Sequence, residues 1–336
     1  MIRQRRRLLI IISIMIIAVL AAVLMFLNHG KKQNDGEGYT EYNGFSPSYA
    51  AYLEKYGQER MADCEVSIPV SEYAAAEGTV QLYEEYEGGK NIILTEEDSY
   101  VEWNITVPQT GLYQISVEYL TYGGNGLTAE RSVYIDGELP YSEAEFLTFE
   151  RVFMDVASEP AVDLDGHDIR PKQEEQYIWQ HKMLADASGY YDEPLKFYLT
   201  EGVHTLGIKA EREPLMLGSV TLCRMKDVPT YAEYKKLHEG KDGESGELKI
   251  FQAEDMYQKS EKSNYPINDR TSSYTQPQNA YAILLNTMGG TRWQKVGSRV
   301  SWIVSVDKSG YYKIAPRYKQ DYISGVKVYR KLMIDG

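Results

Sequence analysis

The sequence predicts an all-β protein built from antiparallel sandwich or barrel modules in tandem, preceded by one N-terminal transmembrane helix. Three observations lead to this prediction. Short segments of alternating apolar and polar residues recur between turn signals. One long pattern of residues occurs twice. A run of uncharged, mostly apolar residues lies near the N-terminus.

The composition is that of a globular protein that does not bind nucleic acid. The 336 residues suffice for two domains, and 25% of them are charged against 43% hydrophobic. Tyrosine is abundant, with 29 Tyr against 7 Phe and 4 Trp, and it suits both strands and wet contact surfaces. The formal net charge of −13 opposes phosphate binding, which needs clustered Lys and Arg.

The N-terminal segment predicts a signal anchor. Residues 8–27 are long enough to cross a membrane, and the basic segment "RQRRR" precedes them. By the positive-inside rule, residues 1–27 form a cytoplasmic basic tip and a transmembrane helix, and the rest is extracellular. We therefore expect a single-pass protein of the cell membrane. A cleaved signal peptide is the alternative, although no A-x-A site follows. Residues 28–46 are polar and glycine-rich, which predicts a flexible stalk.

An internal repeat occupies the rest of the chain. The segment "PSYAAYLEKYG" from Pro47 returns as "PTYAEYKKLHEG" from Pro229, an offset of 182 residues. The segment "VEWNITVPQTGLYQISVEY" from Val101 returns as "VSWIVSVDKSGYYKIAPRY" from Val300, an offset of 199 residues. An insertion of 17 residues in the second copy, between Glu254 and Val300, accounts for the change of offset.

The offsets define two modules. The first spans residues 47–228, and the second spans residues 229–336. Compared with the first module, the second lacks about 90 residues at its end. We therefore expect the second module to be truncated and the chain to be the front part of a longer protein.

Each module is expected to open with a short helix. In the first module Ser46 is a suitable N-cap, and Pro47 suits the first helical position. One stripe of this helix consists of Tyr49, Tyr52, Leu53 and Tyr56.

Alternating segments then predict strands. Residues 101–107 and 113–119 alternate on either side of a turn at residues 108–111, which predicts a half-buried hairpin. Residues 129–135 continue as a strand into a turn at Asp136-Gly137.

The end of the module repeats this pattern. Residues 195–210 predict another hairpin around Glu201-Gly202, and residues 215–225 predict a closing strand. Many short strands with regular turns are typical of an antiparallel sandwich or barrel.

Two charged positions have structural interpretations. Arg131 precedes a buried strand, and we expect it to pair with Glu118 or another acid. Arg212 and Glu213 are expected to form a surface ion pair at a turn.

Several of these segments resemble a known family. "FQAED" from Phe251, the segment from Trp302 to Tyr318, and the strand ending in "IDG" resemble jelly-roll carbohydrate-binding modules of the family 6 and family 35 type. "LTEGVHTLGIKA" and "LMLGSVTL" resemble their closing strands. The resemblance implies jelly-roll β-sandwiches in tandem that bind carbohydrate.

A second resemblance concerns the middle of the first module. "ERSVYIDGELPYSEAEFLTFERVF", "DIRPKQEEQYIW" and "GYYDEPLKFYL" look like the region before the receptor domain in large, membrane-tethered solute-binding proteins of Gram-positive ABC sugar importers. This resemblance implies a role in sugar uptake, with ABC permease subunits as partners.

The insert at residues 150–192 is the first candidate for a binding site. It interrupts the strand pattern and is too long for a plain hairpin loop. An aromatic ring can stack on a sugar face while charged groups bond its hydroxyls. The alternative is that these aromatic residues anchor the insert to the sandwich. The candidate ligand-binding residues are Arg170, Trp179, Tyr190 and Tyr191 of the insert, with Tyr122 beside the turn "YGGNG".

Metal binding is a weaker expectation. Asp163, Asp165 and Asp168 surround a glycine and offer the oxygen ligands that Ca²⁺ prefers, although surface Asp-Gly turns are common without metal. In the resembled modules, an opening-strand Glu and a last-strand Asp hold a structural Ca²⁺. The last strand "LMLGSVTL" offers no Asp, which puts this site in doubt in the first copy. The positions that match the opening-strand ligand are Glu72, Glu254 and Asp255.

Cys64 and Cys223 are the only cysteines. We expect two separate buried thiols. A disulfide is the alternative, since an extracellular setting permits one and the first and last strands of the module could be neighbours.

No enzyme motif is present: G-x-S-x-G, the P-loop, H-E-x-x-H and paired cysteines with metal spacing are all absent from the sequence. We therefore expect a protein without catalytic activity that binds carbohydrate at the cell surface, as the N-terminal part of an ABC-type sugar uptake protein. Two alternatives remain: a structural spacer that presents a downstream domain, and an accessory region of a surface glycoside hydrolase.

Overall fold

The computed structural model describes residues 46–240, 248–320 and 325–335. The predicted anchor at residues 8–27 and nearly all of the predicted stalk lie outside this part of the chain. In the described ranges, no helix has the length and apolar character that crossing a membrane requires.

Helix α2 (Tyr49–Tyr56) opens the first module, but it begins two residues later than expected, with Ser48 as its N-cap. Its tyrosine stripe lies against the sandwich. Tyr49 Oη accepts a 2.9 Å hydrogen bond from the Lys196 amide. Tyr56 stacks on Tyr198, with ring centroids 4.5 Å apart. These contacts dock the helix on the sandwich.

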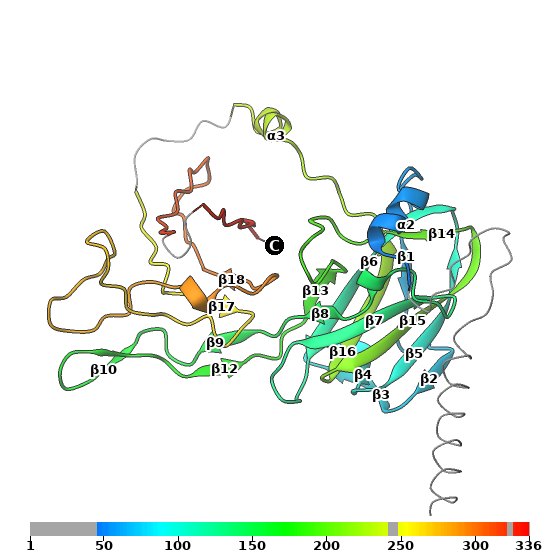
Figure 1. The fold of residues 1–336 in the computed structure, drawn as a ribbon, viewed down its shortest axis with the longest axis horizontal. Helices are drawn as coiled ribbons and strands as arrows, with labels where there is room; N and C mark the ends of the chain where they lie inside the picture. The colour runs from blue at the N-terminus through cyan, green and yellow to red at the C-terminus, as the bar shows by residue number, and fades with distance from the viewer. Residues whose placement is uncertain (1–45, 241–247, 321–324, 336) are drawn as a thin grey trace, which may run out of the picture. The chain divides into compact units, whose positions relative to one another are not determined.

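Two antiparallel sheets follow and face each other (Figure 1). The seven-stranded sheet consists of β1 (Val66–Ile68), β3 (Val80–Tyr86), β4 (Gly89–Thr95), β6 (Gly111–Thr121), β13 (Gln180–Met183), β14 (Phe197–Leu199) and β16 (Leu215–Cys223). The five-stranded sheet consists of β2 (Ala75–Glu77), β5 (Tyr100–Val107), β7 (Ala129–Ile135), β8 (Leu147–Phe149) and β15 (Gly202–Arg212), with the short helix η1 (Ser142–Ala144) between β7 and β8.

The main core lies between these sheets, because alternate side chains of each strand point to the same face. Trp103 is buried at its centre and donates a 3.0 Å hydrogen bond from Nε1 to the Val70 carbonyl. The predicted alternation of β5 and β6 is confirmed by the buried residues Val101, Ile105, Val107, Tyr113, Ile115, Val117 and Tyr119. The all-β sandwich is therefore confirmed for the first module.

The predicted pairing of these strands is wrong. β5 belongs to the five-stranded sheet and β6 to the seven-stranded sheet, so the turn at residues 108–111 crosses the sandwich. The turn at Glu201-Gly202 also crosses the sandwich. β14 pairs with β6 in the seven-stranded sheet, whereas β15 pairs with β5 and β7 in the five-stranded sheet. In both cases the apolar faces of consecutive strands oppose each other across the core instead of lying side by side. Consecutive strands that alternate between sheets are the jelly-roll and Greek-key arrangement.

Arg131 is fully buried in β7, but it pairs with carbonyl groups rather than with Glu118. Its guanidinium donates to the carbonyls of Glu130, Arg212 and Thr95 and to Thr95 Oγ1. Burial lowers its pKa to about 9. Its role is structural, as expected, although backbone carbonyl groups take the place of the expected acidic partner.

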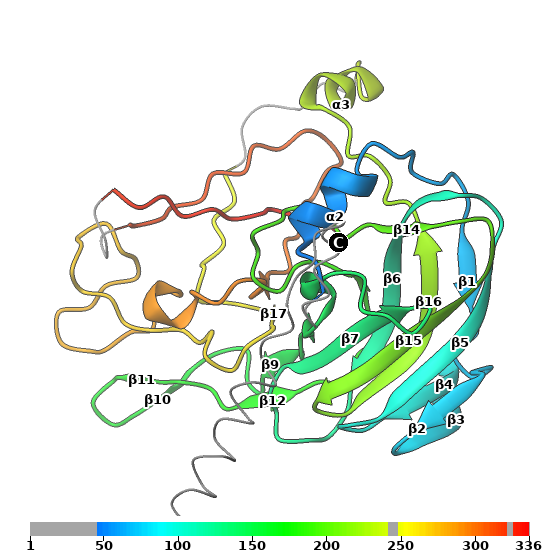
Figure 2. The same cartoon turned by 45° about the vertical axis from the view of Figure 1, so that its right-hand side comes forward.

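The insert leaves the sandwich as two long arms (Figures 1 and 2). One arm carries β9 (Phe153–Asp155), which pairs with β12 (Gln173–Glu175) on the other. Further out, β10 (Ala161–Val162) pairs with β11 (Asp168–Ile169). The insert then returns to the sandwich through β13.

The second copy begins as the first does, with helix α3 (Tyr231–Leu237) at the position equivalent to α2 and a capping box between Thr230 and Glu233. Its remaining regular elements in the described ranges are β17 (Gln258–Lys259), the short helix η2 (Gly290–Arg292) and β18 (Val300–Ser301).

The strands expected over residues 302–318 are not formed. Val304 and Ile314 are 56% and 59% exposed, whereas their counterparts Ile105 and Ile115 in the first copy are at most 3% exposed. In the first copy β15 and β16 flank these positions, and the described residues of the second copy contain no equivalent strands. A second sandwich therefore stays a prediction.

Cys64 and Cys223 are separate thiols. The first and last strands are neighbours, as predicted, and β1 pairs with β16 in a register that places Val66 opposite Leu222. Continuing this register places Cys223 opposite Glu65, so Cys64 and Cys223 point to opposite faces. The disulfide is therefore not formed and the expectation of two separate thiols is confirmed, although Cys64 is half-buried rather than buried.

Candidate functional site

The seven-stranded sheet carries a second apolar cluster on its outer face. Because side chains alternate along a strand, β4, β6 and β16 also direct buried apolar residues away from the main core. These residues are Ile92, Leu94, Leu120 and Met216. We call the rings that cover them the aromatic patch, which consists of Tyr83, Tyr86, Tyr122 and Trp179, with Tyr177 joined to it through Tyr122.

Trp179 is the largest member of the aromatic patch, and two glycines make room for its ring. A Cβ atom on Gly89 would lie 2.5 Å from Trp179 Cε2, and one on Gly218 would lie 2.9 Å from Cζ3. The indole Nε1 donates a 3.1 Å hydrogen bond to the Tyr86 carbonyl. The ring is therefore held against the backbone of β4 and β16 in one orientation.

The tyrosines continue the aromatic surface from Trp179. Tyr86 meets Tyr122 edge-on with centroids 5.4 Å apart, and Tyr122 lies 5.8 Å from Tyr177. Tyr83 lies 6.3 Å from Tyr86. Burial raises the pKa of Tyr86, so its hydroxyl stays protonated and can donate a hydrogen bond at neutral pH.

Polar groups lie beside the aromatic patch. Glu118 on β6 is opposite His181 on β13, and Glu118 Oε1 lies 3.6 Å from His181 Nε2. Ser219 Oγ donates to Glu118 Oε2 at 3.1 Å. A Cβ atom on Gly218 would meet both Glu118 and Trp179 at 2.9 Å, so the carboxylate and the indole flank the same glycine. A flat ring next to exposed hydrogen-bonding groups can hold a ligand that has an apolar face and a hydroxylated edge.

The structure brings together two of the five predicted ligand-binding residues, Tyr122 and Trp179, in the aromatic patch. The guanidinium of Arg170 lies over the ring of Tyr265, 3.7 Å from its centroid.

The remaining two lie near helix α2. Tyr191 packs edge-on against Tyr49 with centroids 4.8 Å apart, whereas Tyr190 is 82% exposed. Asp186 accepts hydrogen bonds from both amides and shapes this loop. These two tyrosines are not part of the aromatic patch.

Sequence reasoning missed Tyr83, Tyr86, Glu118 and His181. The segment "QLYEEY" at residues 81–86 carried a signal for Tyr83 alone, because strand alternation places Tyr86, three residues later, on the opposite face. Glu118 and His181 carried none, since they meet only through pairing of distant strands.

The predicted metal residues are only partly gathered. Asp163, Asp165 and His167 offer ligand atoms within 4.8 Å of one another. Asp168 instead accepts a 2.8 Å hydrogen bond from the Leu285 amide. Asp163 accepts backbone hydrogen bonds, the strongest from His167, and these lower its pKa. Because Ca²⁺ prefers oxygen ligands, the imidazole makes this group a poorer match for Ca²⁺ than three aspartates.

The repeat-equivalent Glu72 and Glu254 differ in burial. Glu72 is exposed, whereas Glu254 is only 9% exposed and burial raises its pKa to about 7. Burial also raises the pKa of Asp255, and nearby Glu159 adds to this effect.

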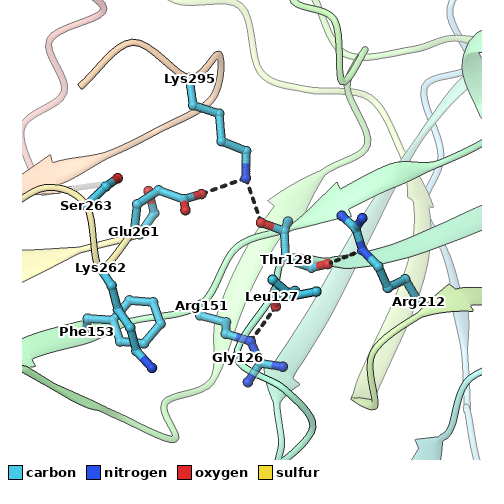
Figure 3. Close-up of a pocket in the computed structure, with 11 residues that line it drawn as sticks. Gly126, Leu127, Thr128, Arg151, Phe153, Arg212, Glu261, Lys262, Ser263 and Lys295 are labelled. Carbon is cyan, nitrogen blue, oxygen red and sulfur yellow. Dashed lines mark hydrogen bonds and ion pairs between the residues drawn. The ribbon is translucent and has the colours of Figure 1, made fainter. Parts of the chain in front are cut away.

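A polar cavity of about 230 Å³ lies at the loop end of the sandwich (Figure 3). The first copy contributes Gly126 to Thr128 and Arg151, and the second contributes Ser260 to Ser263 and Lys295. Lys295 reaches from the second copy to Thr128 Oγ1 at 2.6 Å. The cavity therefore lies where the two copies meet.

No family model and no curated protein sequence matches the chain. Similar solved structures include the C-terminal CBM6 of the Zobellia galactanivorans laminarinase LamC, at 13% identity and a TM-score of 0.29, covering 48% of this chain and 100% of that one. A family 35 carbohydrate-binding module from Clostridium thermocellum is 13% identical with a TM-score of 0.30, covering 47% and 97%. CsCBM6-3 from Clostridium stercorarium, in complex with cellobiose, is 13% identical with a TM-score of 0.27, covering 47% and 93%. Similarities of this size do not define the family of the chain.

Proposed function

We propose that the chain is a carbohydrate-binding protein without catalytic activity, and that the aromatic patch is its sugar-binding surface. The observation that supports this most is the position of Trp179, held across Gly89 and Gly218 beside Glu118. One pyranose face is lined by C–H groups and can stack on the indole, while Glu118 and His181 accept and donate hydrogen bonds at its hydroxylated edge.

The cellular setting belongs to the same proposal. The apolar run at residues 8–27 would anchor the protein in the cell membrane with the modules outside. There it would capture sugar for an ABC-type uptake system, with permease subunits as partners. Two modules on one tether would raise the effective concentration of weak sites. Ca²⁺ binding at Asp163 and Asp165 also remains a proposal.

A glycan array probed with the full-length chain tests the proposed function. The protein should be purified in a detergent without a sugar headgroup, because such headgroups would compete for the site. Retention of a defined glycan class supports the proposal, and retention of none contradicts it and favours the structural spacer. Release of reducing sugar from a retained glycan would instead indicate a glycoside hydrolase.

A further inference from the structure

Two long segments outside the regular strands lie against each other in the structure. The first copy carries the insert at residues 150–192, and the second copy is 17 residues longer between Glu254 and Val300. The insert and the lengthened segment, residues 255–299, run side by side in both views (Figures 1 and 2). The insert interrupts the strand pattern of the first copy, and the added residues of the lengthened segment have no counterpart there, so their contact calls for a common explanation.

Main-chain pairing joins the two segments. β9 of the insert pairs with β17 of the second copy, with Phe153 opposite Lys259. β17 in turn pairs with β18, so the four-stranded sheet β12-β9-β17-β18 takes two strands from each copy. A shared sheet orders both segments together.

A buried ion pair lies at the centre of this sheet. Lys259 Nζ is 2.5 Å from Asp155 Oδ1, and the Lys259 side chain is fully buried. Separation of the copies would leave the aspartate without its partner, and breaking such a pair is strongly unfavourable. This contact therefore favours a permanently closed joint.

Further contacts continue outward along the arms. The ring of Tyr265 contacts two guanidinium groups, with Arg170 of the insert 3.7 Å and Arg292 4.9 Å from its centroid. His167 Nδ1 accepts a 2.9 Å hydrogen bond from the Ile283 amide. The contact thus extends from the base of the insert to its tip.

From this geometry we infer that the insert is a docking surface whose partner is residues 255–299 of the same chain, so that the two copies form one rigid pair. The proposal is independent of sugar binding. It assigns a role to Arg170, whose ring contact holds the second copy.

Hydrogen exchange of the full-length chain, followed by mass spectrometry, tests the proposal. Lys259→Gln removes the buried cation, and amides in residues 153–175 and 258–301 should then exchange about tenfold faster or more. Amides of β15 should be unchanged. The control is Lys172→Gln, which alters an exposed lysine that pairs with Glu174 inside the insert. The exchange rates of all segments should then stay unchanged.

Three results would overturn the proposal. Faster exchange only in residues 258–301 would show that the insert does not depend on them. Unchanged exchange rates in both segments would show that the contact between them stabilises neither one. An equal rise in the exchange rates of the β15 amides would show that Lys259 belongs to the cooperative core of the sandwich. Arg170→Ala tests the same point at an exposed contact, without a buried substitution, and should speed exchange at Tyr265 and at Arg292 but not in β15.

Discussion

Glu213 accepts a 2.6 Å hydrogen bond from the guanidinium of Arg151, and neither side chain is more than 2% exposed. The expected surface pair of Arg212 and Glu213 is therefore wrong, because Glu213 turns inward. Arg151 also pairs with Glu175 and donates to the Gly123 carbonyl. This buried network fixes the loop that follows Tyr122 of the aromatic patch.

Arg151→Met should therefore destabilise the protein by about 3–5 kcal/mol, because it leaves Glu213 buried without its cation. Urea unfolding measures the change. The control is Arg224→Met, which removes only exposed pairs with Asp63 and Asp227 and should cost at most about 1 kcal/mol. Equal effects of the two substitutions would contradict the assignment of a buried network.

Gly89→Ala should displace the indole of Trp179, since the new Cβ would overlap its ring. We expect a loss of about 1–3 kcal/mol from this overpacking. In a Trp179→Ala background the same substitution should cost far less, because the clashing ring is gone. A double-mutant cycle by urea unfolding measures the coupling, and additive effects would mean that Trp179 does not lie over Gly89.

Because of Glu254, we expect the stability of the second copy to depend on pH. Its pKa is raised to about 7 in the folded protein by burial, so its stabilising contribution is present below the unfolded pKa of about 4.3. That contribution is lost as pH rises through 7. Glu254→Gln should therefore stabilise this segment at pH 8, by on the order of 2 kcal/mol, and change little at pH 4.

Exchange of the Tyr257 amide, which donates to the Ser301 carbonyl, reports this local stability. Glu72→Gln, the exposed equivalent in the first copy, is the control and should have no effect at either pH. Stabilisation by Glu254→Gln at pH 4 but not at pH 8 would reverse the predicted sign.

Cys64 and Cys223 should both react with an alkylating reagent in denaturant without prior reduction. Cys64 is half-buried and its Sγ lies 3.2 Å from Tyr113 Oη; it should react first in the native protein. Intact-mass measurement counts the added groups, and labelling that requires a reductant would indicate a disulfide.

The strands were predictable because period-two burial is a local property, and residues 101–107 and 113–119 display it plainly. Their pairing was not predictable, because the turn at residues 108–111 can reverse a chain within a sheet or cross between sheets. Only the packing of Trp103 against Val70 and the distant strands β15 and β16 decides between them.

The candidate site was predictable only in part, for a related reason. Trp179 was conspicuous as a large aromatic residue in an insert, but its partners Gly89 and Gly218 carry no signal until the sheet brings them beneath the ring. The role of Arg151 was not predicted, because Arg151 belongs to no recognisable sequence motif. Arg170 was expected to meet a ligand, and in the structure its ring contact is with Tyr265.

Calorimetric titration with a glycan retained on the array tests the central claim most directly. Trp179→Ala should weaken binding by about 10-fold to 100-fold, because a stacked aromatic anchor typically supplies 1–3 kcal/mol. Tyr190→Ala removes an aromatic side chain that is 82% exposed and lies outside the aromatic patch, and it should leave the affinity unchanged. Loss of binding with Tyr190→Ala and full binding with Trp179→Ala would contradict the account and place the sugar at the loop near helix α2.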